Sequence, residues 1–361
     1  MTQDTSAQLK KSFLKYQHLF VFTAPVVFVI GVVLFAPVEG TAGIDYWLEY
    51  WWLFLFFLIG ATTVNTVGIS GSALFVPFLI FVFPLLARPL EPATIVKVGL
   101  ISESFGLSSS AVAFVQYGLV DRRLGLTIVA GSVPFVVGGA VLSFVVPEPV
   151  FHALLGLALL GAAYLLYTAD LDHGDSTEEA VTDGGRPRSD DGEQLPDDAD
   201  KLGDAGVAVD GDDVTRVTRT GDAYSYTWSG YLERFANYSI GGTFQGLAGF
   251  GAGELGIISQ LRTNVPVRVA IGTNHIVVAT TAILASLVHV FGGGLVPGGH
   301  SLSLASTPWN MVVFTVPATV TGGQIAPYVS NRLNTETLTV GVAGLFGVIS
   351  LALFGMAVGV A

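Results

Sequence analysis

Two glycine-rich strings decide the fold of this chain: Gly68-Ile69-Ser70-Gly71-Ser72 in the first half and Gly249-Phe250-Gly251-Ala252-Gly253 in the second. Each string follows an apolar segment and precedes a short apolar piece. A helix that breaks inside a bilayer exposes backbone groups that lipid cannot satisfy, so such a break persists where protein or a polar cavity takes over. One break alone would favour close packing through small residues. Two breaks at matched positions predict two repeats that meet at a polar site.

The composition of the chain is typical of a membrane protein. Its 361 residues are 51% hydrophobic and 12% charged, with a mean hydropathy of +0.64, whereas soluble domains carry about 25% charged residues. A bilayer core takes about 20 apolar residues as helix, and the chain has material for roughly ten such crossings. There is no cysteine, no phosphate-binding loop and no nucleic-acid signature. We therefore expect no disulfide, no direct use of ATP, no metal, no cofactor and no nucleic-acid partner.

The apolar segments form two groups around one acidic segment. Residues 170–230 hold 17 acidic and 5 basic side chains, which accounts for the entire net charge of −12. This segment is rich in Asp, Gly, Ser and Thr and has few aromatic residues, so we expect a disordered linker that cannot fold alone. The predicted organisation is an N-terminal tail (1–18), an additional transmembrane helix with an outer loop (19–46), a first repeat (47–169), the linker (170–230) and a second repeat (231–361).

The predicted fold class is an all-α integral membrane protein with two inverted repeats. Each repeat is a glycine-broken helical hairpin followed by three transmembrane helices, and one extra transmembrane helix precedes them. We interpret the apolar run after residue 18 as that extra helix, because it is longer than a signal-peptide core and no small-residue cleavage site follows it.

The basic residues of the loops predict the orientation. Lys10, Lys11 and Lys15 are assigned to the cytoplasmic side. If the segment 47–87 is a hairpin that returns to the outside, Arg122 and Arg123 also lie inside. The linker is then cytoplasmic, whereas the loop at 292–308 and the C-terminus lie outside the cell membrane.

The two strings also predict the binding site. A helix that starts after a break presents free N–H groups and a partial positive charge, which suits a small anion. Asn274 and His275, near the start of a later helix, could hydrogen-bond an oxyanion or take a proton. The candidate substrate-binding residues are Gly68, Ser70, Gly71, Ser72, Gly249, Gly251, Gly253, Thr273, Asn274 and His275.

Three ionisable residues inside apolar segments are candidates for proton coupling or gating: Glu254, Glu103 and Lys97. Glu254 directly follows the second string, and proton binding there would relieve its repulsion of an anion. Its alternative role is to cap the following short helix. A pair of Glu103 with Lys97 is a further option, but a spacing of six residues suits one helical face poorly. Lys97 has the alternative of snorkelling to the outer surface.

These residues resemble the sulfite exporter TauE/SafE family of membrane transporters. The family repeats carry a G-x-G-G-G-x-x-x-x-P signature. The first copy here has Gly68, Gly71 and Pro77, with serines at 70 and 72, and the second has Gly249, Gly251 and Gly253. The resemblance covers about 47–168 and 231–359. It implies transport of small anions, often sulfur oxyanions or organosulfonates. We expect the anion and the lipid bilayer as partners, with a homo-oligomer as a further option.

Two other classes remain open. A cation channel or a non-transporting scaffold would also fit a polytopic chain, although the polar residues cluster instead of lining whole helices. An intramembrane serine protease would use Ser70 as nucleophile and His275 as base, and requires the two within hydrogen-bond reach. Because the glycine signature already explains the string around Ser70, we expect no enzyme and no catalytic residue.

Overall fold

The computed structural model describes two helical groups and a small sheet. The described residues are 2–38, 43–168, 206–210, 213–217, 223–227, 230–263, 265–292, 304, 307–330, 332 and 335–358. Most of the predicted linker and most of the predicted outer loop at 292–308 lie outside these residues.

The first group contains one long helix, a broken hairpin and three further long helices. The elements are α1 (Thr2–Phe35), α2 (Ile44–Leu48), α3 (Leu53–Val67), α4 (Ser72–Pro77) with the short π-helix η1 (Phe78–Val82) and the short 3-10 helix η2 (Phe83–Leu85), α5 (Pro92–Gln116), α6 (Arg122–Leu142) and α7 (Glu148–Thr168). The sheet consists of β1 (Gly206–Asp210), β2 (Asp213–Val217) and β3 (Ala223–Thr227). The second group contains α9 (Gly230–Ala248), α10 (Ala252–Leu261), α11 (Val267–Phe291), α12 (Trp309–Ser330) and α13 (Thr335–Ala357).

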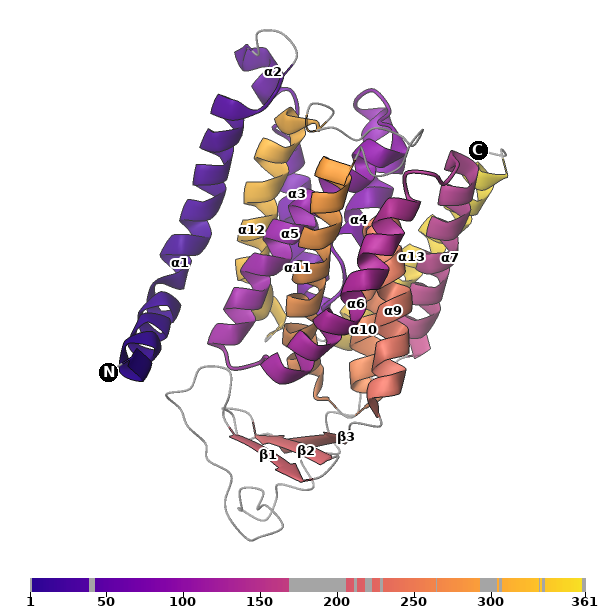
Figure 1. The fold of residues 1–361 in the computed structure, drawn as a ribbon. Helices are drawn as coiled ribbons and strands as arrows, with labels where there is room; N and C mark the ends of the chain where they lie inside the picture. The colour runs from indigo at the N-terminus through magenta and orange to yellow at the C-terminus, as the bar shows by residue number, and fades with distance from the viewer. Residues whose placement is uncertain are drawn as a thin grey trace.

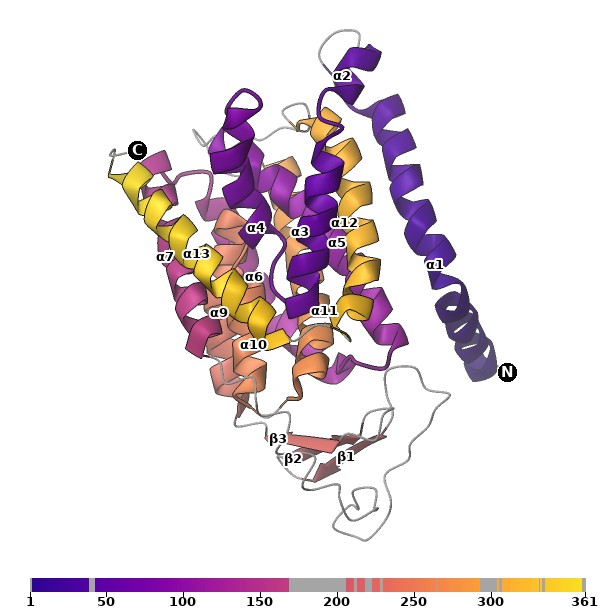
Figure 2. The same ribbon diagram turned by 180° about the vertical axis from the view of Figure 1, so that it is seen from behind.

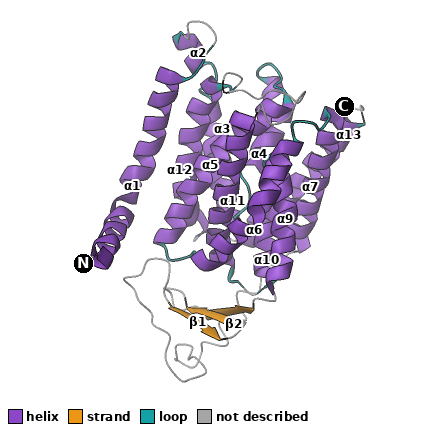
Figure 3. Cartoon of the chain, viewed as in Figure 1, coloured by secondary structure: helices purple, strands orange, loops and turns teal. Residues whose placement is uncertain are grey.

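The helices form one bundle with the sheet at one end (Figures 1 and 3). The hairpin of α3 and α4 has its open end away from the sheet, whereas the hairpin of α9 and α10 opens toward the sheet (Figures 1 and 2). The start of α1 lies at the same end as the sheet, and α13 ends at the opposite end (Figure 1). The two broken hairpins therefore enter the bundle from opposite ends.

The helices of the first group pack against the helices of the second group. Helix α12 packs on α3 and α5, and α6 packs on α9. Helix α11 packs on α5 and α6, and α13 runs along α7. The long helices of one group are thus covered by those of the other.

Several helices in the described part of the chain are long and apolar enough to cross a bilayer. Four segments satisfy this by length and composition: Ile44–Val67, Thr94–Gln116, Arg122–Leu142 and Arg268–Phe291. Shorter apolar helices are Val21–Phe35, Ser72–Leu85, Pro149–Gly161 and Phe346–Ala357. Helix α1 also exposes large apolar side chains, such as Phe22 (47%) and Val26 (57%). Such surfaces fit a lipid environment.

The first helix is longer than predicted. We expected it to begin near residue 19 after a polar tail, but α1 begins at Thr2. Gln, Leu and Lys in this stretch are good helix formers, so the polar residues continue the same helix.

The prediction of a disordered linker was wrong for its last third. Strands β1, β2 and β3 form an antiparallel sheet, in which Val214 pairs with Tyr226 and Arg216 with Tyr224. Val214, Tyr224 and Tyr226 are buried and belong to one apolar cluster with Leu119, which lies between α5 and α6. The physical reason is that alternating Val, Thr and Tyr residues form strands, and the bundle supplies the apolar surface that the segment itself lacks.

The sheet is fixed to the bundle through Asp121, the N-cap of α6. The Asp121 carboxylate accepts hydrogen bonds from Leu124 N (2.9 Å), Arg216 Nη1 (2.9 Å) and Tyr224 Oη (3.1 Å). Burial raises the pKa of the Tyr224 phenol well above its ordinary value, so the phenol keeps its proton and donates it to this bond. One carboxylate therefore caps a helix and holds two strands.

Candidate functional site

The two glycine-rich strings lie in contact in the middle of the chain's helical bundle. A Cβ atom on Gly253 would lie 2.6 Å from Ser70 N, and one on Gly249 would lie 3.3 Å from Ser72 Oγ. Gly251 has a φ of +124°, a backbone conformation that residues other than glycine rarely adopt. Glycine is thus required both for the turn of the second string and for its close approach to the first. We call this contact region the junction.

Glu254 joins the two strings through both of its carboxylate oxygens. Ser70 N donates to Oε1 at 3.1 Å, and Gly251 N donates to Oε2 at 2.8 Å. The second bond caps α10, which is the structural role considered for Glu254 from the sequence. The first bond crosses to the other string, which a cap alone would not require. The side chain is fully buried.

Glu103, from the middle of α5, makes a parallel set of bonds at the first string. Ser72 donates to Oε2 from its backbone N (3.1 Å) and from its Oγ. Gln245 Nε2 donates to the other oxygen, Oε1, at 3.2 Å, and Gln245 Oε1 accepts a bond from Ser70 Oγ at 3.2 Å. Glu103, Gln245, Ser70 and Glu254 therefore form one continuous chain of buried hydrogen bonds.

Asn274 holds the carbonyl side of the junction. Its Nδ2 donates to Gly68 O (2.7 Å) and to Gly253 O (2.8 Å), so one amide satisfies a backbone oxygen from each string. Its Oδ1 accepts from Tyr238 Oη at 2.7 Å, and Tyr238 Oη accepts from Gln260 Nε2 at 2.7 Å. These bonds fix the orientation of the amide group, with its nitrogen toward the backbone oxygens and its oxygen toward Tyr238.

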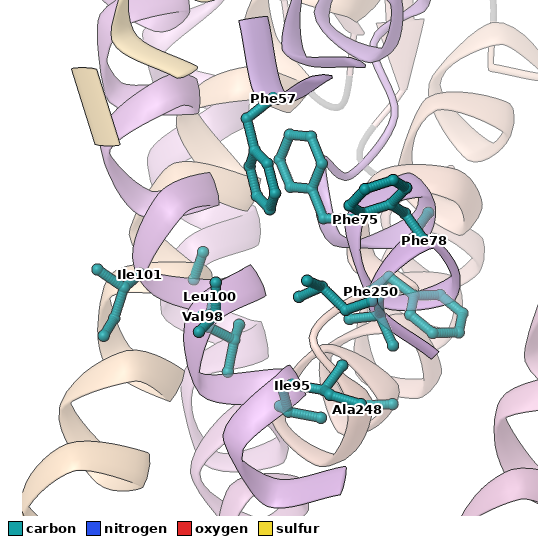
Figure 4. Close-up of a cluster of buried hydrophobic side chains, with 14 of the residues drawn as sticks. Phe57, Phe75, Phe78, Ile95, Val98, Leu100, Ile101, Ala248 and Phe250 are labelled. Atoms are coloured by element: carbon teal, nitrogen blue, oxygen red, sulfur yellow. The ribbon is translucent and has the colours of Figure 1, made fainter. Parts of the chain in front are cut away.

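A cluster of buried apolar side chains includes Phe250 of the second string and Phe75, shortly after the first (Figure 4). Phe57 and Phe75 stack with ring centroids 4.3 Å apart. Phe250 lies inside the second string and is fully buried, as is Leu100 of α5. Such an environment excludes water and strengthens the hydrogen bonds of the polar groups it encloses.

Two predicted site residues, Thr273 and His275, make hydrogen bonds outside the junction. Thr273 Oγ1 accepts a bond from Asp121 N at 2.8 Å, so it holds the turn before α6. His275 Nδ1 lies 3.1 Å from Ser110 Oγ, and its ring packs against Phe114. Lys97 is fully buried and does not snorkel.

A Cβ atom on Gly71 would first meet the Phe75 ring of its own hairpin, at 2.8 Å. Ser70 and His275, the residues that a serine protease would use, make hydrogen bonds to different partners. Ser70 Oγ donates to Gln245, whereas His275 Nδ1 faces Ser110.

The sequence analysis missed Gln245 and Tyr238. Both are polar residues inside an apolar segment, and Gln245 stands one helical turn before Gly249. The prediction took neutral polar residues only from the two strings and the start of the later helix, so it passed over these two residues in the helix before the second string. Among the described residues, no group of three or more His, Cys, Asp or Glu side chains could hold a metal ion.

Comparison with known proteins identifies the family. The model of the family described as sulfite exporter TauE/SafE matches residues 52–353. The chain belongs to this family. The match confirms the resemblance noted from the two strings, and with the apolar helices it makes the chain a multi-pass membrane transporter.

One curated relative supports the same conclusion. The chain is 21% identical over 285 residues to the "Probable membrane transporter protein YunE" of Bacillus subtilis (strain 168), which covers 78% of this chain and 88% of the relative. No solved structure matches the chain at a significant level.

Proposed function

We propose that this family member is a secondary transporter of a small oxyanion, of the sulfur oxyanion or organosulfonate class, and that the anion binds at the junction. The observation that carries the proposal is the cross-bonding of the two strings by Glu254 and Asn274. It places backbone N–H groups from both halves of the chain in one buried region. Backbone N–H groups recognise anions without a cationic side chain.

We also infer that the two halves are inverted repeats. The helix contacts support this. If α3 to α7 are matched in order with α9 to α13, each main contact between helices corresponds to another contact of the same kind. The contact of α12 with α3 then matches that of α6 with α9, and the contact of α12 with α5 matches that of α6 with α11. Helices α5 and α11, and α7 and α13, pack on their own counterparts. Such a two-fold relation permits the two halves to rock about a shared central site, which is how inverted repeats alternate access.

The carboxylates at the junction favour proton coupling. Glu103 and Glu254 are buried beside the proposed anion site, and an ionised carboxylate would repel the anion. Binding of a proton would remove that repulsion. Anion and proton would then cross the membrane together, and a pH gradient would drive anion movement.

The test is flux into proteoliposomes that contain the purified full chain. Labelled sulfite, sulfate and methanesulfonate are offered with and without a pH gradient, and protein-free vesicles provide the background. We expect uptake of sulfite or methanesulfonate above background and acceleration by the gradient. Absence of flux for every oxyanion would contradict the proposed function.

A cation pathway is the second candidate, because the junction holds two carboxyl groups. Measurement of the reversal potential under a salt gradient separates the two. A potential that follows the cation gradient would favour the cation pathway, and one that follows the anion gradient would favour the anion transporter.

A further inference from the structure

The backbone N–H donors of the junction already have an occupant in this structure. Ser70 N and Gly251 N both donate to the Glu254 carboxylate. Ser72 N and Ser72 Oγ both donate to the Glu103 carboxylate. An incoming oxyanion that used these donors would have to replace a carboxylate of the protein, since each N–H group donates one strong bond.

A carboxylate is itself a small oxyanion attached to the chain. It presents two oxygen atoms that share one negative charge, and a sulfite or sulfonate group likewise spreads its negative charge over its oxygen atoms. Charge-assisted bonds from backbone N–H groups suit both. The donor set that holds Glu254 is therefore chemically suited to the substrate class of the proposed function.

Glu254 is better placed for exchange than Glu103. Its two oxygens bridge the two strings, so its departure would free one donor in each half of the chain. Glu103 contacts a single string, and its remaining oxygen is held by the side chain of Gln245. An anion that replaced the Glu254 carboxylate would keep both halves connected.

We propose that the Glu254 side chain is a tethered occupant of the anion site, which competes directly with the transported oxyanion for Ser70 N and Gly251 N. The inference rests on the proposed function and deepens it. A proton on Glu254 weakens its carboxyl group as an acceptor, so the carboxyl group releases the two donors to the anion. Proton binding and anion binding are then linked through the same hydrogen bonds.

Other titratable groups lie on the helices around the junction, among them His275 on α11, whose Nδ1 lies 3.1 Å from Ser110 Oγ. Glu103 on α5 interacts electrostatically with Glu254, and Lys97 on the same helix interacts with His289. His289 on α11 lies 2.8 Å from Gly246 O through Nε2. Tyr238 on α9 is held by Asn274 and Gln260. Of these groups, Glu103 shares the hydrogen-bond chain that contains Glu254.

The test measures binding of methanesulfonate to the purified full chain over a range of pH. This anion does not titrate in that range, so a pH dependence reports on the protein. For the wild type we expect the affinity to rise as the pH falls. For Glu254→Ala we expect tight binding at every pH, with an affinity at alkaline pH at least about tenfold above that of the wild type, or about 1.4 kcal/mol. Glu254→Gln keeps one carbonyl acceptor, so its affinity should lie between the two.

Glu233→Ala is the matched control. It removes an acidic side chain that is 40% exposed and pairs with Arg262 at 3.1 Å, away from the junction. Its binding curve should equal that of the wild type. An unchanged affinity and pH profile in Glu254→Ala would overturn the proposal. So would loss of binding in a folded Glu254→Ala protein, because Glu254 would then support the anion instead of competing with it.

If neither Glu254 variant folds, proton uptake by the wild-type protein tests whether Glu254 competes with the anion. Wild-type protein in weak buffer at alkaline pH should take up about one proton for each methanesulfonate bound. Binding without proton uptake would reject the competition. If the wild type binds no oxyanion at any pH, the proposed function itself fails, which is a different result from wild-type binding that is indifferent to Glu254.

Discussion

Arg216 Nη1 lies 2.9 Å from Asp121 Oδ1, and the two side chains are 6% and 0% exposed. This buried ion pair joins a strand of the acidic linker to the N-cap of α6. Asp121 N also donates to Thr273 Oγ1, one residue before Asn274 at the junction. Two buried hydrogen bonds at Asp121 therefore connect the sheet to α11, one residue along the chain from Asn274.

Removing one partner of this pair should be strongly destabilising. Arg216→Met leaves the Asp121 carboxylate buried without its cation, and we expect a loss of about 3–5 kcal/mol in the free energy of unfolding. The combined Asp121→Asn and Arg216→Met variant should lose less than the sum of the single changes. Thermal unfolding of the detergent-solubilised protein provides the measurement.

The exposed pair Glu233–Arg262 is the control for this experiment. Its side chains are 40% and 66% exposed, so Arg262→Gln should cost about 0–1 kcal/mol. A cost for Arg216→Met as small as that of Arg262→Gln would show that the sheet does not depend on the buried pair.

The linker should tolerate deletion only up to the sheet. Replacing residues 171–203 by a short Gly/Ser linker should leave a monodisperse protein with an unchanged melting temperature. A deletion of 175–213 removes β1 and the first residue of β2, and should lower the melting temperature because Val214 and Arg216 lose their partners on β1. Size-exclusion chromatography and melting curves distinguish the two. Equal behaviour of both deletions would mean that the sheet contributes nothing to stability.

Orientation can be measured with single cysteines, because the native chain has none. Ser225 is exposed on the sheet, and Val145 is 55% exposed after α6 at the opposite end. We expect Ser225→Cys to react with an impermeant maleimide only from the cytoplasmic side, and Val145→Cys only from outside. Ser303→Cys, in the loop outside the described residues, should behave like Val145→Cys. Reaction of Val145→Cys and Ser225→Cys from the same side would contradict the inverted arrangement.

Substitution of Asn274 should lower the stability of the protein more than substitution of its hydrogen-bond partner Tyr238. Asn274→Asp replaces the Nδ2 donor by a carboxylate oxygen that faces Gly68 O and Gly253 O. Two buried carbonyl groups then lose their donor, at about 1–3 kcal/mol each. Tyr238→Phe removes one hydroxyl from the same chain of bonds and should cost about 1 kcal/mol. Melting curves of both variants test this order, and a smaller effect for Asn274→Asp would show that Asn274 does not hold the strings together.

Much of the junction could be predicted from the sequence, because a glycine string inside an apolar segment leaves few structural alternatives. Thr273 shows where this reasoning ends. It is adjacent to Asn274, but neighbouring residues on a helix point about 100° apart, so only one of them faces the junction. The strands were missed for another reason. Composition averaged over 170–230 is acidic and polar, whereas the short alternation around Val214 and Tyr224 becomes stable only on the surface of the bundle.

Gly253→Ala tests the close contact of the two strings. The backbone of Gly253 is not in the left-handed region, so alanine should not strain α10 itself. Its Cβ atom, however, would lie 2.6 Å from Ser70 N and 2.7 Å from Ser70 Oγ, which forces the strings apart and breaks the bond from Ser70 N to Glu254. We expect a loss of oxyanion flux in proteoliposomes of at least about tenfold in a protein that remains folded. Gly138→Ala in α6 is the matched control, because nothing lies within 4 Å of its Cβ position, and it should transport like the wild type. Normal flux in Gly253→Ala would mean that the contact of the strings serves packing and that the anion binds elsewhere.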